Sequence, residues 1–506
     1  MSGDQNDVIA FLQNPVSYGA SGPVARVDTH CAAVFLVGER AFKLKKSVRY
    51  PYLDFSTLEK RKAACDAEMA LNRPAAPGLY LGLRSLGRDR NGHICWDAAE
   101  AIDWVIEMRR FPDDALLSVV AARGGLDRRL CTELADRIAA YHEQAPIVRD
   151  RPGAATLARL IQGIRDALDH AGGGLDAAKI DAVIAGLRLQ AEHHAALIDR
   201  RAASGHVRHC NGDLHLANIC LIDGTPTLFD ALEFDADLAT IDVLYDLAFL
   251  IMDLEHRGLR DLATIVLNRY LDRRDEQDGL ALIPLFAAMR AAIRGYASAA
   301  AGNHDAAAGY LEHALRCLET RPAMLVAIGG LSGSGKSHLG RNLAGRIGGV
   351  GGARHLRSDV LRKNLAGLPS PEQKLSPTAY TQKASDQVYT IMRAQAARLL
   401  EDGIAVICDA VFAKPGERDG IEAVATAASV PFRGIWLEAP RTTMASRIEG
   451  RRGDASDATT AVLESQLHYD LGGIGWARID SDRDDAAVLA DAVALLPAGS
   501  SAKSRD

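Results

Sequence analysis

The period of apolar and polar positions changes several times along the chain, and each change marks a predicted element. In AAVFLVGERAFKLKK, residues 32–46, apolar positions alternate after a turn at Gly38–Glu39, which predicts two short paired strands. The next stretch, STLEKRKAACDAEMALNR, residues 56–73, opens with a capping Ser or Thr and then a glutamate, which predicts a helix. The first hundred residues therefore mix strand and helix.

The rest of the chain divides into a helical part and a part with buried strands. Helical spacing dominates residues 112–205 and 240–319, and between them NICLIDGTPTLFD, residues 218–230, predicts a hairpin that turns at Asp223–Gly224. Beyond residue 321, the apolar runs MLVAI, GIAVICDA and FRGIWLEA are separated by helical stretches, which is typical of a parallel α/β sheet. We expect a domain over 1–320, with a small lobe to about 105 and a large lobe from 106, a second domain over 321–497, and a disordered tail over 498–506.

Composition narrows the class of protein. The chain has 506 residues, 48% of them hydrophobic and 25% charged, which fits a soluble globular protein of two or three domains. A net charge of −6 with mixed signs gives no general attraction to nucleic acid or to an anionic membrane. Eight cysteines without a CxxC pair predict free thiols, and the N-terminus lacks the pattern of a secretion signal, so we expect a cytoplasmic protein. Oligomeric state is left open.

The clearest motif is GLSGSGKS, residues 330–337. It fits G-x-x-x-x-G-K-[ST], with Gly330, Gly335, Lys336 and Ser337 at the fixed positions and Ser332, Gly333 and Ser334 within the loop. Glycines allow a tight loop whose backbone N–H groups point at phosphates, and the following helix adds its positive end. Lys336 would contact the outer phosphates, and Ser337 would be a ligand of Mg²⁺. A chance glycine-rich turn is the alternative, but a buried strand precedes the loop and a helix follows it.

Further charged residues suit this second domain. Asp359 follows in RSDVLRK, and Asp409 ends the strand VICD, where carboxylates of such a sheet face the ligand crevice. Asp409 is the predicted partner of a metal. Arg447, Arg451 and Arg452 lie in one short run, either as a solvated helix face or as a lid that closes over phosphates.

Together these motifs resemble the small P-loop kinases, the group of gluconate kinase, shikimate kinase and the zeta toxins, over about residues 323–495. The resemblance implies ATP-dependent phosphoryl transfer to a small hydroxyl compound. It assigns the role of general base to Asp359 and charge stabilisation to Arg447 and Arg451.

A second set of polar residues lies in GDLHLAN, residues 212–218. Asp213 is followed by Asn218, and Asp230 ends the returning strand of the predicted hairpin. A carboxylate near an acceptor hydroxyl, with an asparagine and a second carboxylate for Mg²⁺, is what kinase chemistry requires. Each residue alone would more often be a turn former.

This segment resembles the aminoglycoside phosphotransferase-like family, whose fold is that of protein kinases, over roughly residues 25–300. The resemblance implies that Asp213 is the catalytic base, that Asn218 and Asp230 hold metal, and that Lys43, with Lys45 as the alternative, grips the nucleotide phosphates. It pairs Glu68 with that lysine. Glu107 and Met108 would be at the hinge that meets adenine, and Asp246 would brace the catalytic loop.

Two positions depart from that family. Position 211 is asparagine where the family has histidine before glycine and aspartate, and no G-x-G-x-x-G loop precedes Lys43. Among other candidates, we interpret His142 and His215 as packed structural residues, because phosphoryl transfer is mostly positioning and electrostatics. Cys210 and Cys220 are interpreted as small apolar fillers.

The sequence therefore predicts a bifunctional phosphotransferase in which each domain binds ATP, or GTP, with Mg²⁺ and phosphorylates a small-molecule hydroxyl such as that of a sugar or amino sugar. One alternative is that a single domain is catalytic and the other is a nucleotide-bound regulatory module or scaffold. Another is a protein kinase, although no acceptor-docking segment or activation-loop phosphosite is visible in the sequence.

Overall fold

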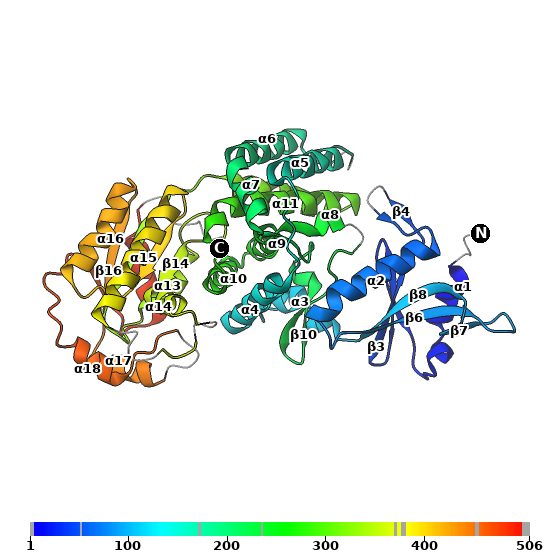
Figure 1. Cartoon of the computed structure of the whole chain (residues 1–506), viewed down its shortest axis with the longest axis horizontal. Coiled ribbons are helices and arrows are strands. Elements are labelled where there is room, and N and C mark those ends of the chain that lie inside the picture. Colours follow the sequence, from blue (N-terminus) through cyan, green and yellow to red (C-terminus); the bar gives the residue numbers. More distant parts are fainter. Residues whose placement is uncertain are drawn as a thin grey trace. The chain divides into compact units, whose positions relative to one another are not determined.

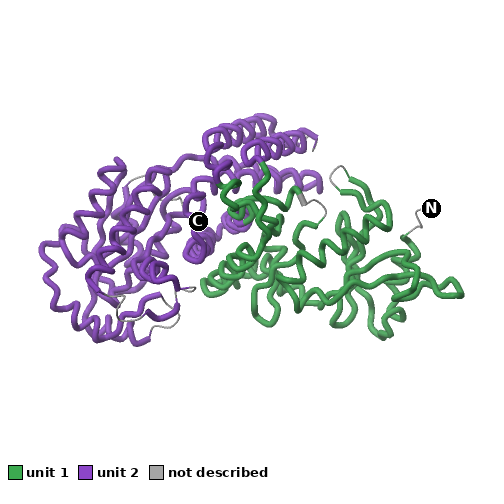
Figure 2. Tube along the Cα trace, viewed as in Figure 1, with its two compact units in different colours: residues 1–151, 201–246 green, residues 152–200, 247–506 purple. Residues whose placement is uncertain are grey.

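The computed structural model describes residues 5–50, 53–170, 174–233, 236–368, 372–375, 381–450 and 455–497. The chain forms two compact units, each made of two segments (Figure 2). Unit 1 comprises residues 1–151 and 201–246, and unit 2 comprises 152–200 and 247–506. The predicted tail over 498–506 and Arg451 lie outside the described residues.

Unit 1 begins with an antiparallel sheet covered by one helix on each face (Figure 1). The apolar side chains of α1 pack on one face, together with Phe35, Phe42 and Leu44. On the other face α2 contributes Cys65, and its start is capped by Thr57, as the sequence predicted. The sheet order is β1 (Ala25–Asp28), β2 (Ala32–Val37), β3 (Arg40–Lys45), β8 (Ala101–Arg109), β6 (Tyr80–Arg88), β7 (Ile94–Trp96), and the helices are α1 (Asn6–Gln13), η1 (Pro15–Tyr18) and α2 (Leu58–Ala75).

The rest of unit 1 carries the predicted hairpin. Its turn has Asp223 and Gly224 at φ 51° and 78°, a backbone that suits a two-residue turn between strands. The remaining elements of this unit are β4 (Arg49–Tyr50), β5 (Leu53–Asp54), η2 (Asp113–Ala115), α3 (Leu117–Ala122), α4 (Arg128–Gln144), β9 (Val207–His209), η3 (Leu216–Asn218), β10 (Ile219–Ile222), β11 (Thr225–Leu228), α8 (Ala236–Ala239) and β12 (Thr240–Asp242).

Unit 2 contains the parallel sheet that the sequence predicted. Five parallel strands lie in the order β14 (Arg354–Arg357), β15 (Val406–Asp409), β13 (Leu325–Gly329), β16 (Phe432–Glu438), β17 (Ala477–Asp480). All of β13 is buried, which explains its uninterrupted apolar sequence. The helices around the sheet are α13 (Lys336–Ala344), α14 (Ser358–Leu365), α15 (Gln382–Glu401), α16 (Pro415–Ala427), α17 (Arg441–Glu449), α18 (Thr460–Gln466) and α19 (Asp485–Ala494).

A helical region completes unit 2. Its elements are α5 (Gly153–His170), α6 (Ala177–His193), α10 (Arg260–Arg273), η4 (Gln277–Leu282), α11 (Ile283–Ala300) and α12 (His304–Leu318), while α7 (Ala195–Ser204) and α9 (Val243–His256) run across the boundary between the units. Within the described chain, Gln277–Ala300 has the length and composition of a membrane span. About two thirds of its most apolar window, 67%, is buried inside the protein, as in the core helix of a soluble protein.

The division into units differs from the predicted boundary at residues 320 and 321. Arg260 of α10 donates to the carbonyl oxygens of Gly345 and Gly348 at 2.7 and 2.9 Å. The Leu267 side chain fills the space beside Gly351, where an added Cβ would lie 2.4 Å from Leu267 Cδ2. Helix α10, which lies before residue 320, thus packs on the P-loop domain. Contacts between segments far apart in sequence decided this, and local spacing carries no sign of them.

Candidate active sites

The GLSGSGKS segment forms the predicted strand, loop and helix in unit 2. Gly330, Gly333 and Gly335 have φ of 140°, 84° and 91°, a backbone that side chains rarely adopt. An added Cβ at Gly333 would lie 2.4 Å from the Met444 carbonyl oxygen, so the loop also needs glycine for space. Lys336 begins α13, and its Nζ donates to the Leu331 carbonyl oxygen at 2.9 Å. The loop therefore curls over the lysine at a helix N-terminus, as phosphate binding requires.

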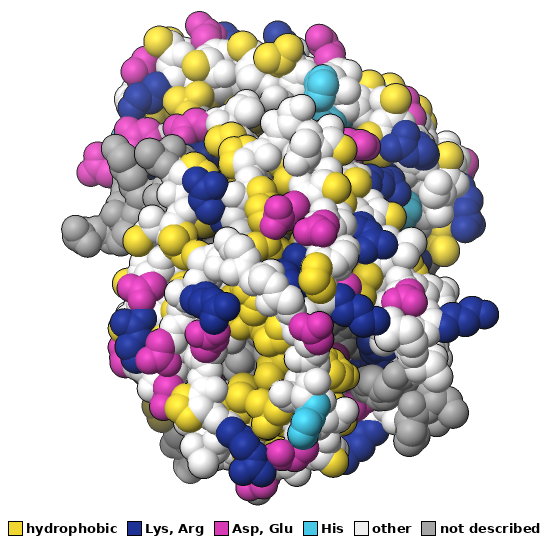
Figure 3. All heavy atoms as spheres, turned by 90° about the vertical axis from the view of Figure 1, so that its left-hand side faces the viewer, with side chains coloured by type: hydrophobic (Ala, Val, Ile, Leu, Met, Phe, Trp, Pro, Cys, Tyr) yellow, Lys and Arg dark blue, Asp and Glu magenta, His cyan; other side chains and the backbone are white. Residues whose placement is uncertain are grey.

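This loop opens into a cavity of about 970 Å³. The cavity is lined by Lys336, Ser337, Asp359, Asp409 and Arg447, which brings five predicted residues together, and by the predicted loop residues Ser332, Gly333 and Gly335. Apolar side chains reach its mouth, since Val462 and Tyr469 of the lining are 41% and 48% exposed. The space-filling view of this part of unit 2 shows a hollow in which apolar side chains gather between charged ones (Figure 3).

Three buried polar atoms of this site have no hydrogen-bond partner among the described residues. They are Ser334 Oγ in the loop, Asp409 Oδ2 at the end of β15, and Arg447 Nη1 in α17. The other end of the Arg447 guanidinium is fixed, because Nη2 donates to the Ser481 carbonyl oxygen at 2.7 Å. Arg447 also lines the cavity, and its unsatisfied buried Nη1 fits a bound phosphate group.

The pKa values of two carboxylates of the site are shifted in opposite directions. Burial would raise the pKa of Asp409, but the neighbouring His355 and Lys336 more than offset it, so the pKa is lowered. A carboxylate that stays ionised suits a metal partner. Burial raises the pKa of Asp359, and a hydrogen bond from Ser456 and the charge of Arg357 offset this only in part. A raised pKa makes the ionised carboxylate a better proton acceptor, as a general base requires.

In unit 1 two lysines of β3 converge on one glutamate of α2. Glu68 is fully buried, and its Oε1 and Oε2 accept from Lys43 Nζ at 2.8 Å and from Lys45 Nζ at 2.5 Å. Burial alone would raise the pKa of Glu68, but the two ammonium groups lower it to about 2. Lys43 also reaches Asp230 Oδ1 at 2.5 Å, whereas Lys45 is 1% exposed and pairs with Glu233. Contact with Asp230 supports Lys43 as the phosphate lysine and Lys45 as its buried support.

The catalytic-loop candidates lie beside each other. Asn218 Nδ2 donates to Asp213 Oδ2 at 2.8 Å and to its carbonyl oxygen at 3.0 Å. The amide of Phe229 donates to the Asn218 carbonyl oxygen at 3.1 Å, so Asp230 directly follows a residue bonded to Asn218. Carboxylate and amide oxygens are the ligands that Mg²⁺ prefers, so the set fits that ion. His215 Nδ1 accepts from the Ala217 amide at 3.2 Å, which agrees with a structural role.

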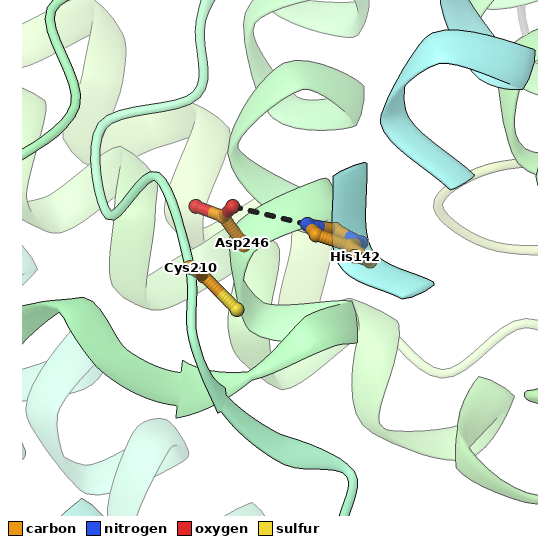
Figure 4. A group of neighbouring side chains, drawn as sticks. All are labelled: His142, Cys210 and Asp246. Atoms are coloured by element: carbon orange, nitrogen blue, oxygen red, sulfur yellow. Dashed lines mark hydrogen bonds and ion pairs between the residues drawn. The ribbon is translucent and has the colours of Figure 1, made fainter. Parts of the chain in front are cut away.

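A buried aspartate braces this loop from behind. Asp246 accepts from the amides of Asn211 and Gly212 at 3.1 and 2.9 Å. Its Oδ2 also lies 3.1 Å from His142 Nε2, and Cys210 completes a buried group of three (Figure 4). His, Cys and Asp could hold a metal, but both carboxylate oxygens already accept hydrogen bonds, so we interpret the group as structural. Asn211, at the position where the sequence resemblance implied a histidine, accepts from the Asp213 amide at 3.1 Å.

We expect Asp246→Asn to destabilise unit 1. The amide side chain of asparagine keeps the shape of the aspartate. It has no negative charge, however, and only one oxygen to accept the buried hydrogen bonds from Asn211, Gly212 and His142. The expected loss in free energy of unfolding is about 3 kcal/mol. Urea unfolding of the full chain, followed by a probe in unit 1, measures it. Asp223→Asn, on the exposed hairpin turn, is the control, and equal stability of the two variants would contradict the bracing role.

Glu107 and Met108 lie inside the sheet. β8 is placed between β3 and β6, and Met108 pairs with Ala41 on one side and with Tyr80 on the other. Glu107 bonds Arg40 at 3.1 Å. The chain leaves the sheet after Arg109, and the next residue is still bonded to it, because the Arg110 amide donates to the Glu39 carbonyl oxygen at 2.9 Å. The assignment of Glu107 and Met108 to the hinge stays a prediction.

Several residues of both sites carried no local signal in the sequence. Glu233 comes three residues after Asp230, yet only folding shows that it meets Lys45. In unit 2, Gln466 Oε1 accepts from the Ser332 amide at 2.8 Å, and Ser481 Oγ donates to the Ser334 carbonyl oxygen at 2.8 Å. Both fix the phosphate loop from more than a hundred residues away. Lys363 is buried, and its Nζ donates to Asp457 Oδ1 at 3.1 Å. We therefore interpret Lys363 as a structural residue.

Comparison with solved structures finds similar folds for each region. A gluconokinase from Sinorhizobium meliloti covers 34% of this chain and 91% of its own, at 20% identity and a TM-score of 0.25. An aminoglycoside phosphotransferase covers 61% of this chain and 97% of its own, with 16% identity and a TM-score of 0.38. A choline kinase from Cryptosporidium parvum covers 62% of this chain and 94% of its own, with 10% identity and a TM-score of 0.39. At these scores the likenesses by themselves establish no activity.

Sequence comparison gives firmer results. Residues 325–469 match the family described as AAA domain, so the C-terminal part is a P-loop nucleotide-binding domain. The lysine, glutamate and aspartate set of unit 1 is a second group of charges, separate from this domain, and it has the types that nucleotide phosphates and a metal ion would need. Uncharacterized proteins of Mycobacterium tuberculosis and Mycobacterium bovis are 31% identical over 474 residues, covering 88% of this chain and 90% of theirs. The protein therefore belongs to the same family as these mycobacterial proteins.

Proposed function

We propose that the protein is an ATP-dependent phosphotransferase with two active sites, each of which moves the γ-phosphate of ATP to a hydroxyl group of a small molecule such as a sugar or amino sugar. The observation that carries the proposal is the cavity of unit 2, where the phosphate loop, Asp359, Asp409 and Arg447 share one space. The arrangement of Asp213, Asn218 and Asp230 supports the second site in unit 1.

The residues of unit 2 divide the chemistry among them. The loop amides and Lys336 bind the phosphates, and Ser337 and Asp409 would hold Mg²⁺. When bound, the ion supplies neutralisation of charge on the phosphates. Asp359 takes the proton of the acceptor hydroxyl, and Arg447 stabilises charge on the transferred group.

The residues of unit 1 provide the equivalent set. Lys43, held by Glu68, binds phosphate oxygens, and Asn218 and Asp230 would hold the ion. Asp213 takes the proton of the hydroxyl, and its hydrogen bond from Asn218 fixes the carboxylate in place. Asp246 holds the backbone of the loop from the buried side.

The decisive experiment follows transfer of isotope from γ-labelled ATP. The full chain is offered a panel of sugars, amino sugars and other polyols, and separately a cell extract. Label in a small solute supports the proposal, and loss of that label only when both Lys43 and Lys336 are replaced supports two active sites. Label in protein alone would favour a protein kinase instead, and no label beyond ATP hydrolysis would contradict phosphoryl transfer.

A single active site is the second candidate. Asn211 replaces the family's histidine, and no glycine loop precedes Lys43. Both changes concern unit 1, which would then be the nucleotide-bound regulatory part. In that case Lys336→Ala abolishes all label transfer, and Lys43→Ala removes only nucleotide binding or its effect on rate.

The rate of phosphoryl transfer in unit 2 should fall on the acid side at a higher pH than it would with a base of ordinary aspartate pKa. A general base works only when deprotonated, and the pKa of Asp359 is raised above the ordinary 3.8. The transfer rate is therefore at its maximum at pH values above the raised pKa, and it falls as the pH drops through that pKa. Rate against pH, measured in a chain with Asp213→Asn, checks this. A limb at the pH of an ordinary aspartate would contradict the assignment of Asp359 as base.

A further inference from the structure

One buried histidine lies next to the predicted metal carboxylate of unit 2. His355 is the second residue of β14, and Asp409 ends the neighbouring strand β15. His355 Nε2 lies 3.4 Å from Asp409 Oδ2, and the two side chains are 3% and 4% exposed. Neither atom has a hydrogen-bond partner among the described residues. The two atoms therefore form an ion pair with each other across the neighbouring strands.

Two neighbours fix the position of the histidine. Its ring lies against α13, the helix that starts at Lys336, because an added Cβ at Gly340 would be 2.4 Å from His355 Nε2. On the other side, Asn268 Oδ1 accepts from the His355 amide at 2.8 Å, and Asn268 Nδ2 donates to the Ala353 carbonyl oxygen at 2.9 Å. The helix α10 thus clamps the start of β14 and holds the ring between the phosphate-loop helix and Asp409.

We propose that His355 is a positioning residue that fixes Asp409 Oδ2 and so directs the other carboxylate oxygen toward the metal ion of the unit 2 site. The proposal rests on the function proposed above for that site. Carboxylates that bind metal are commonly held by a second hydrogen bond from a residue behind them. The separation of 3.4 Å is longer than a formed hydrogen bond, and such bonds are often long before ligands bind.

The test measures how Mg²⁺ controls nucleotide binding in the full chain. His355→Leu fills the space but donates no hydrogen bond, and His355→Gln restores an N–H group. Binding of ATP is titrated calorimetrically at a series of Mg²⁺ concentrations and also in EDTA. All variants carry Asp230→Asn, to weaken metal binding in unit 1. The binding signal of the same chain with Lys336→Ala is subtracted from that of each variant. The difference reports binding at the unit 2 site alone.

We expect His355→Leu to raise the Mg²⁺ concentration for half-maximal binding by ~10- to 100-fold, with affinity in EDTA unchanged. His355→Gln should recover most of this shift. His313→Leu, a change to another buried histidine of unit 2, is the control and should shift nothing. A shift below twofold for His355→Leu, or an equal loss of affinity in EDTA, would overturn the proposal.

One further outcome separates this inference from the proposed function. If the unmodified chain shows no Mg²⁺-dependent binding that Lys336→Ala removes, the function proposed for unit 2 fails, and His355 has no metal site to serve. If that binding is present and insensitive to His355→Leu, the proposed function stands and the positioning role alone is wrong.

Discussion

Asp213→Asn should lower phosphoryl transfer in unit 1 by ~10²- to 10⁴-fold, the usual effect of losing a positioned general base. The amide oxygen of asparagine can still accept the hydrogen bond that Asn218 Nδ2 donates to Asp213 Oδ2 at 2.8 Å, while the negative charge beside His215 Nε2, at 3.4 Å, is lost. The maximal rate should therefore fall while affinity for ATP is kept. The measurement uses a chain with Lys336→Ala, so that unit 2 contributes no transfer.

The matched control is Asp223→Asn in the turn of the same hairpin. Its carboxylate is exposed and pairs with Arg109 at the surface, where such ion pairs contribute little. Transfer by this variant should equal that of the parent chain. Equal rates for Asp213→Asn and Asp223→Asn would show that Asp213 is not the base, and would favour a regulatory unit 1.

Asp359→Asn should have an effect of similar size in unit 2, again ~10²- to 10⁴-fold. Asp359 lines the same cavity as Lys336 and Asp409, so its loss removes the proton acceptor while phosphate and metal contacts remain. Binding of ATP should be kept, and the acid limb of the pH profile should disappear together with the rate. The parent chain here carries Asp213→Asn.

Asp419→Asn is the control for this second prediction, since Asp419 is exposed on α16 and does not line the cavity. Its transfer rate should match the parent. If Asp359→Asn retains the full rate while Lys336→Ala does not, the phosphate loop is productive and another group accepts the proton. If neither substitution in unit 2 changes transfer, the phosphate loop and Asp359 take no part in it, and the function proposed for unit 2 is wrong.

The phosphate loop was the part of the site best predicted from sequence. All its chemistry lies within eight consecutive residues, and the strand before it and the helix after it are fixed by local apolar spacing. The hairpin from Ile219 to Leu228 was equally predictable, because Asp223 and Gly224 adopt the turn backbone that their types favour. The sequence could not choose between Lys43 and Lys45, since both point to one face of β3.

The packing of the helices before residue 320 shows where sequence spacing is insufficient. Residues 240–319 carry the helical spacing of a separate lobe, yet Arg260, Leu267 and Asn268 pack against the chain between 345 and 355. Those contacts join segments about 85 residues apart, and no local pattern records which surface a helix will cover. The same holds for His355, whose neighbour Asp409 is distant in sequence and adjacent only because β14 pairs with β15.

By itself the sequence determined the two fold types, the phosphate loop and the set of carboxylates, because each depends on residue type at short spacing, where sterics and hydrogen bonding act locally. The tertiary structure alone decided which charges meet: Lys43 with Asp230, Lys45 with Glu233, and Asp409 with His355. Burial and charge separation depend on distances across the folded chain, and these set the pKa of Asp359 and the strength of every buried pair.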